Sequence, residues 1–473
     1  MKIHFIGIGG IGMSALARYY LSHGFEVSGS DAAGSKITEE LAKEGAEIFS
    51  GHKKANIKDG TDLIIYSAAV PEDNPELEEA KKLSIKCQTY GQALGELTKK
   101  MWTIAISGTH GKSTTTAMIG LILERAGFDP TVIVGTKLRE WGNSNCRVGK
   151  SEYLVIEADE YTASFLNYWP KMIVLTNIEE DHLDYYKDLK HILATFKEYL
   201  GHLPKDGILV VNEEDENISE IITNFPASPA GGQYPISNEN PKFKSQIPKY
   251  RIEKYNSKFG ATGLSLKIPG RHNLMNAYAA ITAARALEIP DDISLKALNE
   301  FNGTWRRFEY RGMVNGARIY DDYAHHPTEI KATLQGAREY LNSLSLSDSD
   351  RNYAVVRQRQ LWCVFQPHQF QRTSYLFDNF VEAFDEADVV VSIDIYSVAG
   401  REKPEIIKSV SSQKLAEAIE QRNSALGFKD KKIIYLDSFE KAEQYLKENL
   451  KKRDMAIIMG AGDIYKLTEG LIK

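Results

Sequence analysis

A lysine followed by hydroxyl residues stands at the start of a predicted helix, in the run Ser107–Thr115 (SGTHGKSTT). The apolar segment Trp102–Ile106 precedes this run, and Ala117–Ala126 follows it with apolar residues at helical spacing. Strand, glycine loop and helix together bind phosphate, because the amides at a helix start and the helix dipole both favour an anion. Lys112 can reach terminal phosphates, and Ser113 can place its hydroxyl on a magnesium ion.

This run matches the general phosphate-loop pattern incompletely. The pattern GxxxxGK[ST] would place its first glycine at position 106, where the chain has Ile106, and the first glycine present is Gly108. The alternative is a tight strand-to-helix turn without a ligand. The glycine-lysine-hydroxyl triplet at this place favours the phosphate loop.

Composition limits the class of protein. A chain of 473 residues is expected to form two to four domains, and 42% hydrophobic with 26% charged residues is typical of a globular protein. The net charge of -6, without a long basic run, argues against nucleic acid as a partner. No apolar run reaches the roughly 18 residues of a spanning helix, and no signal peptide pattern is seen, so we expect no membrane association and a cytoplasmic location. Cys87, Cys146 and Cys363 are expected to be small core residues in a reducing compartment.

A second glycine motif lies near the N-terminus, in residues 3–12 (IHFIGIGGIG). Gly7, Gly9 and Gly12 have dinucleotide-binding spacing between a predicted strand and a helix at Met13–His23. A second predicted strand ends at Asp31, about 20 residues later, where such folds place a ribose-binding acid. The motif alone indicates NAD, but the same turn can bind another diphosphate, such as that of a UDP-sugar, or no ligand.

Short β-branched runs follow the phosphate loop, with helical or loop segments between them, and predict a mostly parallel sheet. These runs are Thr131–Val134, Tyr153–Ile156, Met172–Thr176 and Ile208–Val211. Two of them end in the polar clusters Glu157–Glu160 and Asn177–His182. Because ligands bind at the carboxyl ends of parallel strands, these acids are predicted magnesium ligands, and the alternative is a solvated acidic loop.

The region after residue 224 has less regular patterns. Residues 225–262 are expected to form irregular loops with an edge hairpin. Asn273 precedes an alanine-rich helix, where it can be a helix N-cap. The pair Arg306 and Arg307 can be surface charge or can bind a phosphate when domains close.

A second parallel α/β sheet is predicted in the last third of the chain. Its strands are expected at Arg318–Tyr320, Leu361–Phe365, Val389–Ile393, Ile433–Leu436 and Met455–Met459. Two of these strands run into chemically rich segments, Asp321–Glu329 (DDYAHHPTE) and Gln366–Thr373 (QPHQFQRT). Acids, an aromatic residue and histidines at a strand end predict a binding site rather than core packing.

The motifs together resemble the Mur ligase family, over essentially the whole chain. The residues that carry this resemblance are Gly7–Met13, Gly108–Thr116, Glu157–Leu166, Thr176–Asp184, Gly270–Ala277, Arg306–Phe308, Tyr320–Glu329, Phe365–Thr373 and Gly460–Ile464. Within the family they look like the branch that joins L-alanine to the carboxylate of UDP-N-acetylmuramate at the expense of ATP. The resemblance implies three α/β domains: a Rossmann-like UDP-sugar domain (1–98), a central ATPase domain (99–303) and a Rossmann-like C-terminal domain that closes over the site (304–473).

The resemblance also implies roles for individual residues, with ATP and Mg²⁺ as cofactors. The ATP-binding residues would be Gly108, Thr109, His110, Gly111, Lys112, Ser113, Thr114, Asn273, Arg306, Arg307 and Asp322. The substrate-binding residues would be Gly7, Gly9, Gly10, Gly12, Met13, Asp31, Ser67, Tyr323, His325, His368 and Arg372. Metal ligands would be Ser113, Glu157 and His182, and catalytic residues would be Lys112, Glu157, His182, Arg307 and His325. We expect a monomer or a weak homodimer.

Three positions depart from the family pattern. Ser113 stands where threonine is more usual, and Gln369 stands where some members have arginine, which leaves Arg372 as a single anion contact. The segment 341–360 is longer and more polar than the usual connection.

Three rival functions remain open at this point. A murein tripeptide recycling ligase would act on the same nucleotide sugar, but residues Phe365–Thr373 favour the alanine enzyme. A nicotinamide oxidoreductase would leave Lys112, Glu157 and His182 without a role. A non-catalytic nucleotide sensor is disfavoured by the intact set of Lys112, Glu157, His182 and Arg372.

Overall fold

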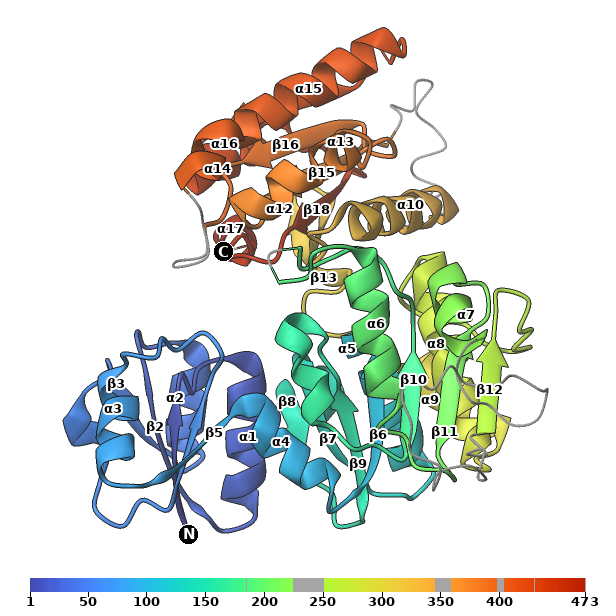
Figure 1. Cartoon of the computed structure of the whole chain (residues 1–473). Coiled ribbons are helices and arrows are strands. Elements are labelled where there is room, and N and C mark those ends of the chain that lie inside the picture. Colours follow the sequence, from blue (N-terminus) through green and yellow to red (C-terminus); the bar gives the residue numbers. More distant parts are fainter. Residues whose placement is uncertain (184, 224–250, 345–358, 398–403, 429, 473) are drawn as a thin grey trace. The chain divides into compact units, whose positions relative to one another are not determined.

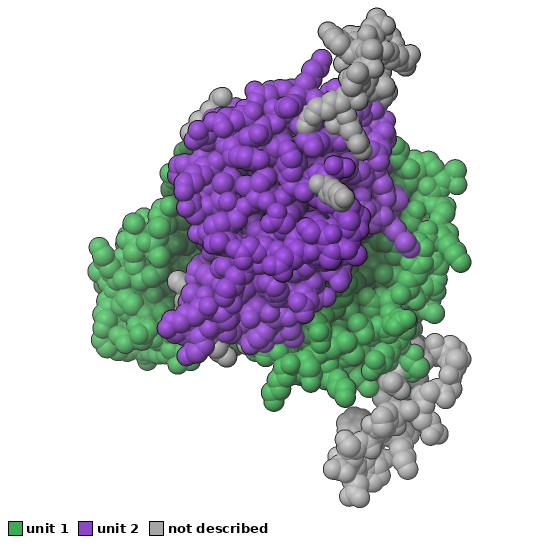
Figure 2. All heavy atoms as spheres, turned by 90° about the horizontal axis from the view of Figure 1, so that it is seen from above, with its two compact units in different colours: residues 1–181, 185–265, 275–304 green, residues 182–184, 266–274, 305–473 purple. Residues whose placement is uncertain are grey.

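The computed structural model describes residues 1–183, 185–223, 251–344, 359–397, 404–428 and 430–472. The chain forms two compact units, drawn in green and purple in Figure 2. Unit 1 contains residues 1–181, 185–265 and 275–304, and unit 2 contains residues 182–184, 266–274 and 305–473. Each unit is built on α/β sheets, as the sequence predicts.

The first sheet of unit 1 is fully parallel, with the strand order β3-β2-β1-β4-β5 (Figure 1). Its strands are β1 (Lys2–Ile6), β2 (Glu26–Asp31), β3 (Glu47–Ser50), β4 (Leu63–Tyr66) and β5 (Lys86–Thr89). Its helices are α1 (Ile11–Ser22), α2 (Lys36–Lys43), η1 (Lys54–Asn56), α3 (Pro75–Lys82) and α4 (Tyr90–Thr98). The strand order reverses at β1, so the glycine turn after β1 lies at the point where such sheets bind ligands.

The central sheet of unit 1 has seven strands in the order β12-β11-β10-β6-β9-β7-β8. They are β6 (Trp102–Ser107), β7 (Thr131–Leu138), β8 (Ser144–Arg147), β9 (Tyr153–Glu157), β10 (Met172–Leu175), β11 (Ile208–Asn212) and β12 (Arg251–Tyr255). The intervening helices are α5 (Lys112–Arg125), η2 (Arg139–Trp141), η3 (Tyr161–Asn167), α6 (Leu189–Leu200), α7 (Glu216–Thr223), α8 (Arg271–Ala286) and α9 (Asp291–Glu300). Strand β6 lies between β10 and β9, so the phosphate loop and both polar clusters start at adjacent strand ends.

The sheet of unit 2 has six strands in the order β13-β14-β18-β15-β16-β17. They are β13 (Glu309–Val314), β14 (Ala317–Asp322), β15 (Leu361–Phe365), β16 (Val389–Ile393), β17 (Lys432–Leu436) and β18 (Met455–Met459). The helices are α10 (Pro327–Ser343), α12 (Phe370–Tyr375), α13 (Phe377–Val381), α14 (Pro404–Ser409), α15 (Ser412–Ala425), α16 (Phe439–Asn449) and α17 (Tyr465–Leu471).

Central strands of the unit 2 sheet are buried on both faces. In β15, Cys363 and Phe365 belong to one apolar cluster, whereas Trp362 and Val364 belong to the cluster on the opposite face. This alternation follows from the two-residue period of a strand, and burial on both faces explains the unbroken apolar runs in the sequence.

Several strands were not predicted or were predicted differently. Strands β3, β5, β8 and β13 were missed, and β8 and β13 each pair antiparallel with a neighbour, so neither large sheet is purely parallel. The edge hairpin at 225–262 stays a prediction, and in the described part of this range β12 adds parallel to β11 at the edge of the sheet. Residues 224–250 and most of the polar segment 341–360 lie outside the described residues.

Buried polar contacts join the first sheet to the central sheet of unit 1. Helix α1 packs on β7 and β8. Arg18 donates to Asn145 (2.6 Å) and to Glu44 (2.9 Å), and Asn145 donates to the Ile11 carbonyl (2.5 Å) and to the Ser14 hydroxyl (2.9 Å). A buried guanidinium and a buried amide are stable here because their polar atoms have partners.

None of the helices in the described residues has the length and apolar content needed to cross a membrane.

The three cysteines are free thiols, with Cys146 and Cys363 buried and Cys87 half-buried. Cys146 and Cys363 are core residues, as predicted, and Cys87 packs against an apolar cluster while partly exposed.

A carboxylate, Glu76, is completely buried beneath the first sheet's glycine turn. It accepts hydrogen bonds from Ser30 (2.6 Å) and Asn56 (2.5 Å), and His4 lies 3.6 Å away. Burial by itself would raise the pKa of Glu76, but the contacts with His4, Ser30 and Asn56 outweigh it and hold the pKa at about 2. The ionised carboxylate therefore stabilises the fold.

We predict that Glu76→Gln lowers the free energy of unfolding at pH 7 by on the order of 2–3 kcal/mol. Because the folded pKa is depressed, this contribution is present above the unfolded value of about 4.5 and is lost as the pH falls towards 2. Urea titrations at pH 7 and pH 3.5 measure it. Glu78→Gln on the exposed face of α3 is the control, and an equal loss in both variants would contradict the prediction.

Candidate active site

The phosphate loop owes its shape to two glycines in the left-handed region. Gly108 has φ 131 and Gly111 has φ 85, and side chains at either position would be strained. A Cβ atom at Gly108 would collide with the Thr176 hydroxyl, and one at Gly111 would collide with the Asn276 side chain. The incomplete motif is therefore still a tight loop, because Gly108 provides the turn that the general pattern assigns to an earlier glycine.

Residues after β10 hold this loop in place. Thr109 N–H donates to the Asn177 carbonyl (2.9 Å), and His110 N–H donates to the Asn177 side chain (2.8 Å). The Thr176 hydroxyl in turn donates to the His110 carbonyl (2.6 Å). The second polar cluster thus fixes the loop conformation, and Gly111 leaves the first turn of α5 without a side-chain cap. Amides at Lys112, Ser113 and Thr114 are suited to an anion.

Lys112 lies within this loop, and its side chain is only 11% exposed. Its ammonium group donates to the carbonyls of Gly108 (2.7 Å) and Thr109 (3.1 Å) and to the Glu160 carboxylate (2.8 Å). Burial by itself would lower the pKa of Lys112, but Glu160, Asp159 and Glu157 raise it above its ordinary value. The lysine is therefore a fixed positive charge.

Ser113 and Glu157 form an all-oxygen cluster beside Lys112. The Ser113 hydroxyl lies 2.9 Å from one Glu157 oxygen and 3.0 Å from the other, and Gly135 N–H donates to the same carboxylate (2.8 Å). A hydroxyl and a carboxylate are ligands that magnesium accepts next to phosphate. The two residues fit the predicted metal, and Gly135 orients the carboxylate.

The first-sheet glycine turn brings together four of the predicted substrate residues. Gly7 has φ 81, and a Cβ there would press on Ser67 at 3.2 Å. Asp31 accepts a hydrogen bond from Gly9 N–H (2.8 Å), and a Cβ at Gly9 would meet the same carboxylate. Asp31 therefore supports the turn itself.

Helix α1 starts from this turn with its amides uncapped. Gly10 is the N-cap residue and provides no side-chain hydrogen bond to the first turn. Gly12 packs against the Tyr90 ring, and the Met13 side chain is buried in the core. The helix start is suited to a diphosphate, which backbone groups of these residues would contact.

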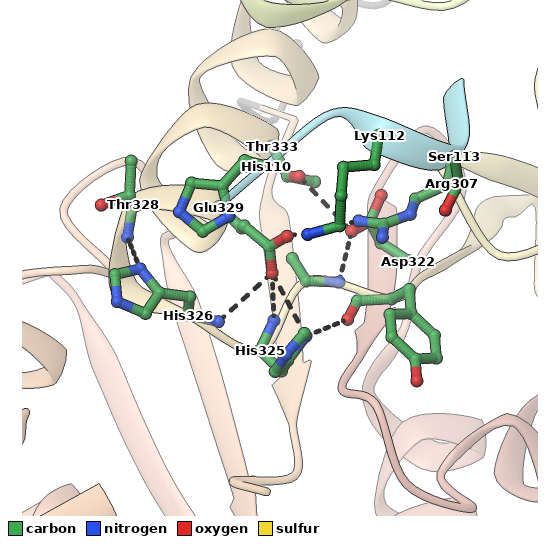
Figure 3. Close-up of polar contacts among 12 residues, drawn as sticks. His110, Lys112, Ser113, Arg307, Asp322, His325, His326, Thr328, Glu329 and Thr333 are labelled. Atoms are coloured by element: carbon green, nitrogen blue, oxygen red, sulfur yellow. Dashed lines mark hydrogen bonds and ion pairs between the residues drawn. The ribbon is translucent and has the colours of Figure 1, made fainter. Parts of the chain in front are cut away.

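In unit 2, Asp322 is a buried residue that organises the start of α10. It accepts from Phe308 N–H (2.8 Å) and Ala324 N–H (2.8 Å), and burial raises its pKa. The Thr333 hydroxyl lies 3.4 Å away (Figure 3). Contact with ribose stays a prediction.

The two adjacent arginines have different environments. Arg306 is 2% exposed, its guanidinium donates to the carbonyls of Gly460 and Gly462, and burial lowers its pKa. The Arg307 side chain is 28% exposed, lies 3.5 Å from Glu329 and stacks over the Tyr323 ring at 5.1 Å. Arg306 stabilises the glycine turn after β18, so Arg307 is better placed for a ligand.

The remaining predicted residues of unit 2 form a cluster at the ends of β14 and β15. The Tyr323 and His325 rings lie 5.4 Å apart, and the His325 and His368 rings lie 5.9 Å apart. Arg372 lies 3.3 Å from the Nδ1 atom of His368. His325 N–H donates to Glu329 (3.0 Å), a contact drawn in Figure 3. Glu329 thus orients the histidine turn.

Two predicted residues lie in short segments that belong to unit 2. His182 has φ 54, and its role as a metal ligand stays a prediction. Asn273 is not the helix N-cap, because α8 already begins at Arg271 and the Asn273 side chain donates to the Pro269 carbonyl (2.7 Å). Contact with adenine also stays a prediction.

Sequence reasoning missed four residues of these clusters as individuals. Glu160 holds Lys112, Gly135 holds Glu157, Asn276 packs on Gly111, and Glu329 holds the histidine turn. A glycine inside a strand pattern is a signal of close approach, which could have found Gly135. The contacts of Glu160, Asn276 and Glu329 could be recognised only from distances in the structure.

Three family models match consecutive parts of the chain. They are the Mur ligase family catalytic domain (residues 2–102), the Mur ligase middle domain (106–284) and the Mur ligase glutamate ligase domain (306–462). The chain therefore belongs to the Mur ligase family.

Curated relatives extend this match over the full length. A UDP-N-acetylmuramate–L-alanine ligase of Acetivibrio thermocellus is 40% identical over 100% of this chain and 95% of its own length. The ligase of the same name from Clostridium tetani is 42% identical over 100% and 98%.

Solved structures agree on the fold. A UDP-N-acetylmuramate-alanine ligase from Thermotoga maritima has a TM-score of 0.76 and 26% identity, covering 100% of this chain and 98% of that chain. A murein peptide ligase from Psychrobacter arcticus has a TM-score of 0.68 with the same coverage, but its 23% identity shows the fold alone.

We predict that Gly111→Ala weakens nucleotide binding at least tenfold, because it adds both backbone strain and a collision with Asn276. Gly127→Ala is the matched control, since Gly127 has a similar φ of 82 and no atom lies within 4 Å of the place that an added methyl group would take. It should lose about 1–2 kcal/mol of stability and keep nucleotide affinity. Calorimetric titration with ADP compares them, and equal affinities would contradict the prediction.

Proposed function

We propose that this protein is an ATP-dependent ligase that joins L-alanine to the carboxylate of UDP-N-acetylmuramate, with release of ADP and phosphate. The observation that carries the proposal is the similarity of 40–42% over the full chain to ligases of that name. The product would be the first peptide-bearing precursor of peptidoglycan.

The reaction needs activation of the acid. A carboxylate is a poor acceptor for an amine, so transfer of the γ-phosphoryl group of ATP first gives an acyl phosphate and ADP. The alanine amine then attacks the acyl carbon, a proton leaves the nitrogen, and phosphate departs from a tetrahedral intermediate. The enzyme has to stabilise negative charge in both steps by groups that are already in position.

The central sheet supplies groups of the right kind. Lys112 and the uncapped amides of α5 would bind the phosphates of ATP, with Gly108 to Thr114 wrapping around them. Ser113 and Glu157 would hold Mg²⁺, with His182 as a further ligand. When bound, this ion supplies charge neutralisation at the phosphates.

The first sheet would bind the UDP part of the substrate. The uncapped start of α1, at Gly10 to Met13, suits a diphosphate as well as it suits NAD. Full-length similarity to sugar-nucleotide ligases supports the UDP-sugar. Asp31 would act mainly by holding Gly9, with Ser67 beside Gly7.

Further binding residues are proposed in unit 2. We propose that Arg307 contacts phosphate and that Asp322 and Asn273 contact the nucleoside. Tyr323, His325, His368 and Arg372 would bind the muramoyl and alanine parts, since cation and histidine groups cluster there. We retain the three-domain division 1–98, 99–303 and 304–473, a cytoplasmic location and a monomer or weak homodimer as parts of the proposal.

The murein tripeptide recycling ligase is the less favoured function. The curated relatives described above carry the alanine ligase name, whereas the murein peptide ligase structure supports only the fold. Phosphate release from ATP with UDP-N-acetylmuramate and, separately, L-alanine, glycine, L-serine or the tripeptide distinguishes the two. Release that requires the sugar nucleotide and L-alanine is expected, and release with the tripeptide alone would overturn the proposal.

Removal of the loop lysine gives a specific test. We predict that Lys112→Ala lowers phosphate release on the order of 100-fold or more, because the charge that meets the γ-phosphoryl group is lost. Lys150→Ala removes an exposed lysine of the same unit and should retain activity. Circular dichroism checks that both variants are folded. Unchanged turnover in Lys112→Ala would exclude the phosphate-loop role.

Arg372 tests the placement of the acceptor site. We predict that Arg372→Ala raises the KM for UDP-N-acetylmuramate or L-alanine at least tenfold and changes the KM for ATP less than about twofold. Arg422→Ala, which removes another partly buried arginine of unit 2 paired with Asp385, is the control. An effect on ATP alone would place Arg372 at the nucleotide.

A further inference from the structure

The ammonium group of Lys112 is fully engaged in the structure. Its three hydrogens face the Gly108 carbonyl, the Thr109 carbonyl and the Glu160 carboxylate, whose oxygens lie 2.8 and 3.1 Å away. The two carbonyls belong to the loop itself, whereas the carboxylate belongs to the segment after β9. A phosphate that binds Lys112 would compete with this carboxylate for the same ammonium group.

Glu160 is built into this position rather than swinging in from the surface. The residue is 3% exposed. Its carbonyl accepts from the Tyr186 hydroxyl (2.5 Å) and from Ala163 N–H (2.9 Å). Downstream, Phe165 is fully buried and stacks on Tyr199 at 4.4 Å. The carboxylate thus lies on a segment that is fixed on both sides.

The segment between these anchors is strained. Thr162 has φ 52 and Ala163 has φ 53, and neither is a glycine. Left-handed backbone costs an L-residue roughly 1–2 kcal/mol, and more for a β-branched side chain. Consecutive residues of this kind persist only where surrounding contacts hold them, and they cluster at switch segments. Here they directly follow the residue that binds Lys112.

We infer that Glu160 is a positioning residue for Lys112 that occupies the place of a nucleotide phosphate, and that it sets nucleotide affinity and promotes ADP release. This inference rests on the proposed binding of ATP at the glycine loop. The carboxylate keeps the buried ammonium paired and in place in the absence of nucleotide. When a nucleotide phosphate binds Lys112, the hydrogen bonds between Lys112 and Glu160 break, and the backbone strain at Thr162 and Ala163 is released.

The physical basis is an exchange of anions on one buried cation. A buried ion pair is costly to break by removing one partner, because the remaining charge lacks a counterion. A nucleotide phosphate would serve as the counterion instead. Because the lysine is already paired with Glu160, the binding free energy includes only the difference between the lysine–phosphate and lysine–carboxylate interactions. If residue 160 is neutral, the binding free energy includes the full lysine–phosphate interaction, and the nucleotide dissociates more slowly.

The test is calorimetric titration of ADP into the full chain in EDTA, so that neither metal nor turnover contributes. Glu160→Gln is expected to bind ADP on the order of tenfold more tightly than the unaltered protein. Asp159→Asn removes an exposed charge of the same segment that makes no hydrogen bond to the lysine and acts on it only at a distance, so its gain in affinity should be much smaller than that of Glu160→Gln. In ligation assays, Glu160→Gln should lower both the KM for ATP and kcat, because ADP release slows.

A measurement on the unaltered protein covers a variant that fails to fold. Hydrogen exchange at the Ala163 and Phe165 amides, which donate to the Glu160 and Asp159 carbonyls, should accelerate when ADP binds. Glu160→Asp, which withdraws the carboxylate by one methylene, should also bind ADP more tightly. Equal or weaker ADP binding in Glu160→Gln, an equal gain in Asp159→Asn, or unchanged exchange would each overturn the inference.

These outcomes separate the inference from the proposed function. Tighter ADP binding in Glu160→Gln together with no ligation in the unaltered protein would support the role of Glu160 and reject the ligase. Ligation by the unaltered protein together with no gain in ADP affinity in Glu160→Gln would support the ligase and reject the role of Glu160. Absence of ADP binding by the unaltered protein would reject both.

Discussion

A buried positive charge at the start of α5 governs the arrangement of the central sheet. Lys112 is kept ionised inside the protein by three neighbouring carboxylates and two loop carbonyls. The carboxylates lie at the end of β9 and the carbonyls directly after β6, and these two strands are parallel neighbours in the sheet. Parallel strands that deliver their carboxyl ends to one edge are what allow a cation, acids and helix amides to meet without competing for the same backbone.

The first sheet also contains a buried charge that neighbouring polar groups stabilise, but here the charge is negative. There the buried carboxylate Glu76 is satisfied by Ser30 and Asn56, and the Ser30 carbonyl accepts from the Gly7 and Ile8 amides. The glycine turn therefore rests on a polar core. Arg18 and Asn145 then connect α1 to the β7–β8 hairpin, whose Gly135 holds Glu157. Buried polar groups that would be costly alone are therefore paired at several places within unit 1.

In unit 2, two residues that look equivalent in the sequence have different environments in the structure. Arg306 and Arg307 are adjacent, but the positive φ of Arg306 turns its guanidinium into the core, where glycine carbonyls and aromatic rings surround it. Asp322 is similarly engaged, because it accepts from the backbone amides of Ala324 in its own segment and of Phe308 before β13. Burial and these contacts thus give Arg306 and Asp322 a structural role, whereas the adjacent Arg307 is more exposed.

The sequence by itself determined the α/β class, the sheets and both glycine turns, because unbroken apolar runs and glycine spacing are local consequences of strand burial and tight turns. It also determined the family, through the order of motifs along the chain. Only the tertiary structure decided that β8 pairs antiparallel with β7, since its short polar sequence carries no pairing signal. For β13, the Asn315-Gly316 turn before β14 is a hairpin signal that sequence reasoning missed. The tertiary structure alone placed Glu160 on Lys112 and Asn276 on Gly111. Contacts between residues distant in the chain depend on strand order, which no local pattern encodes.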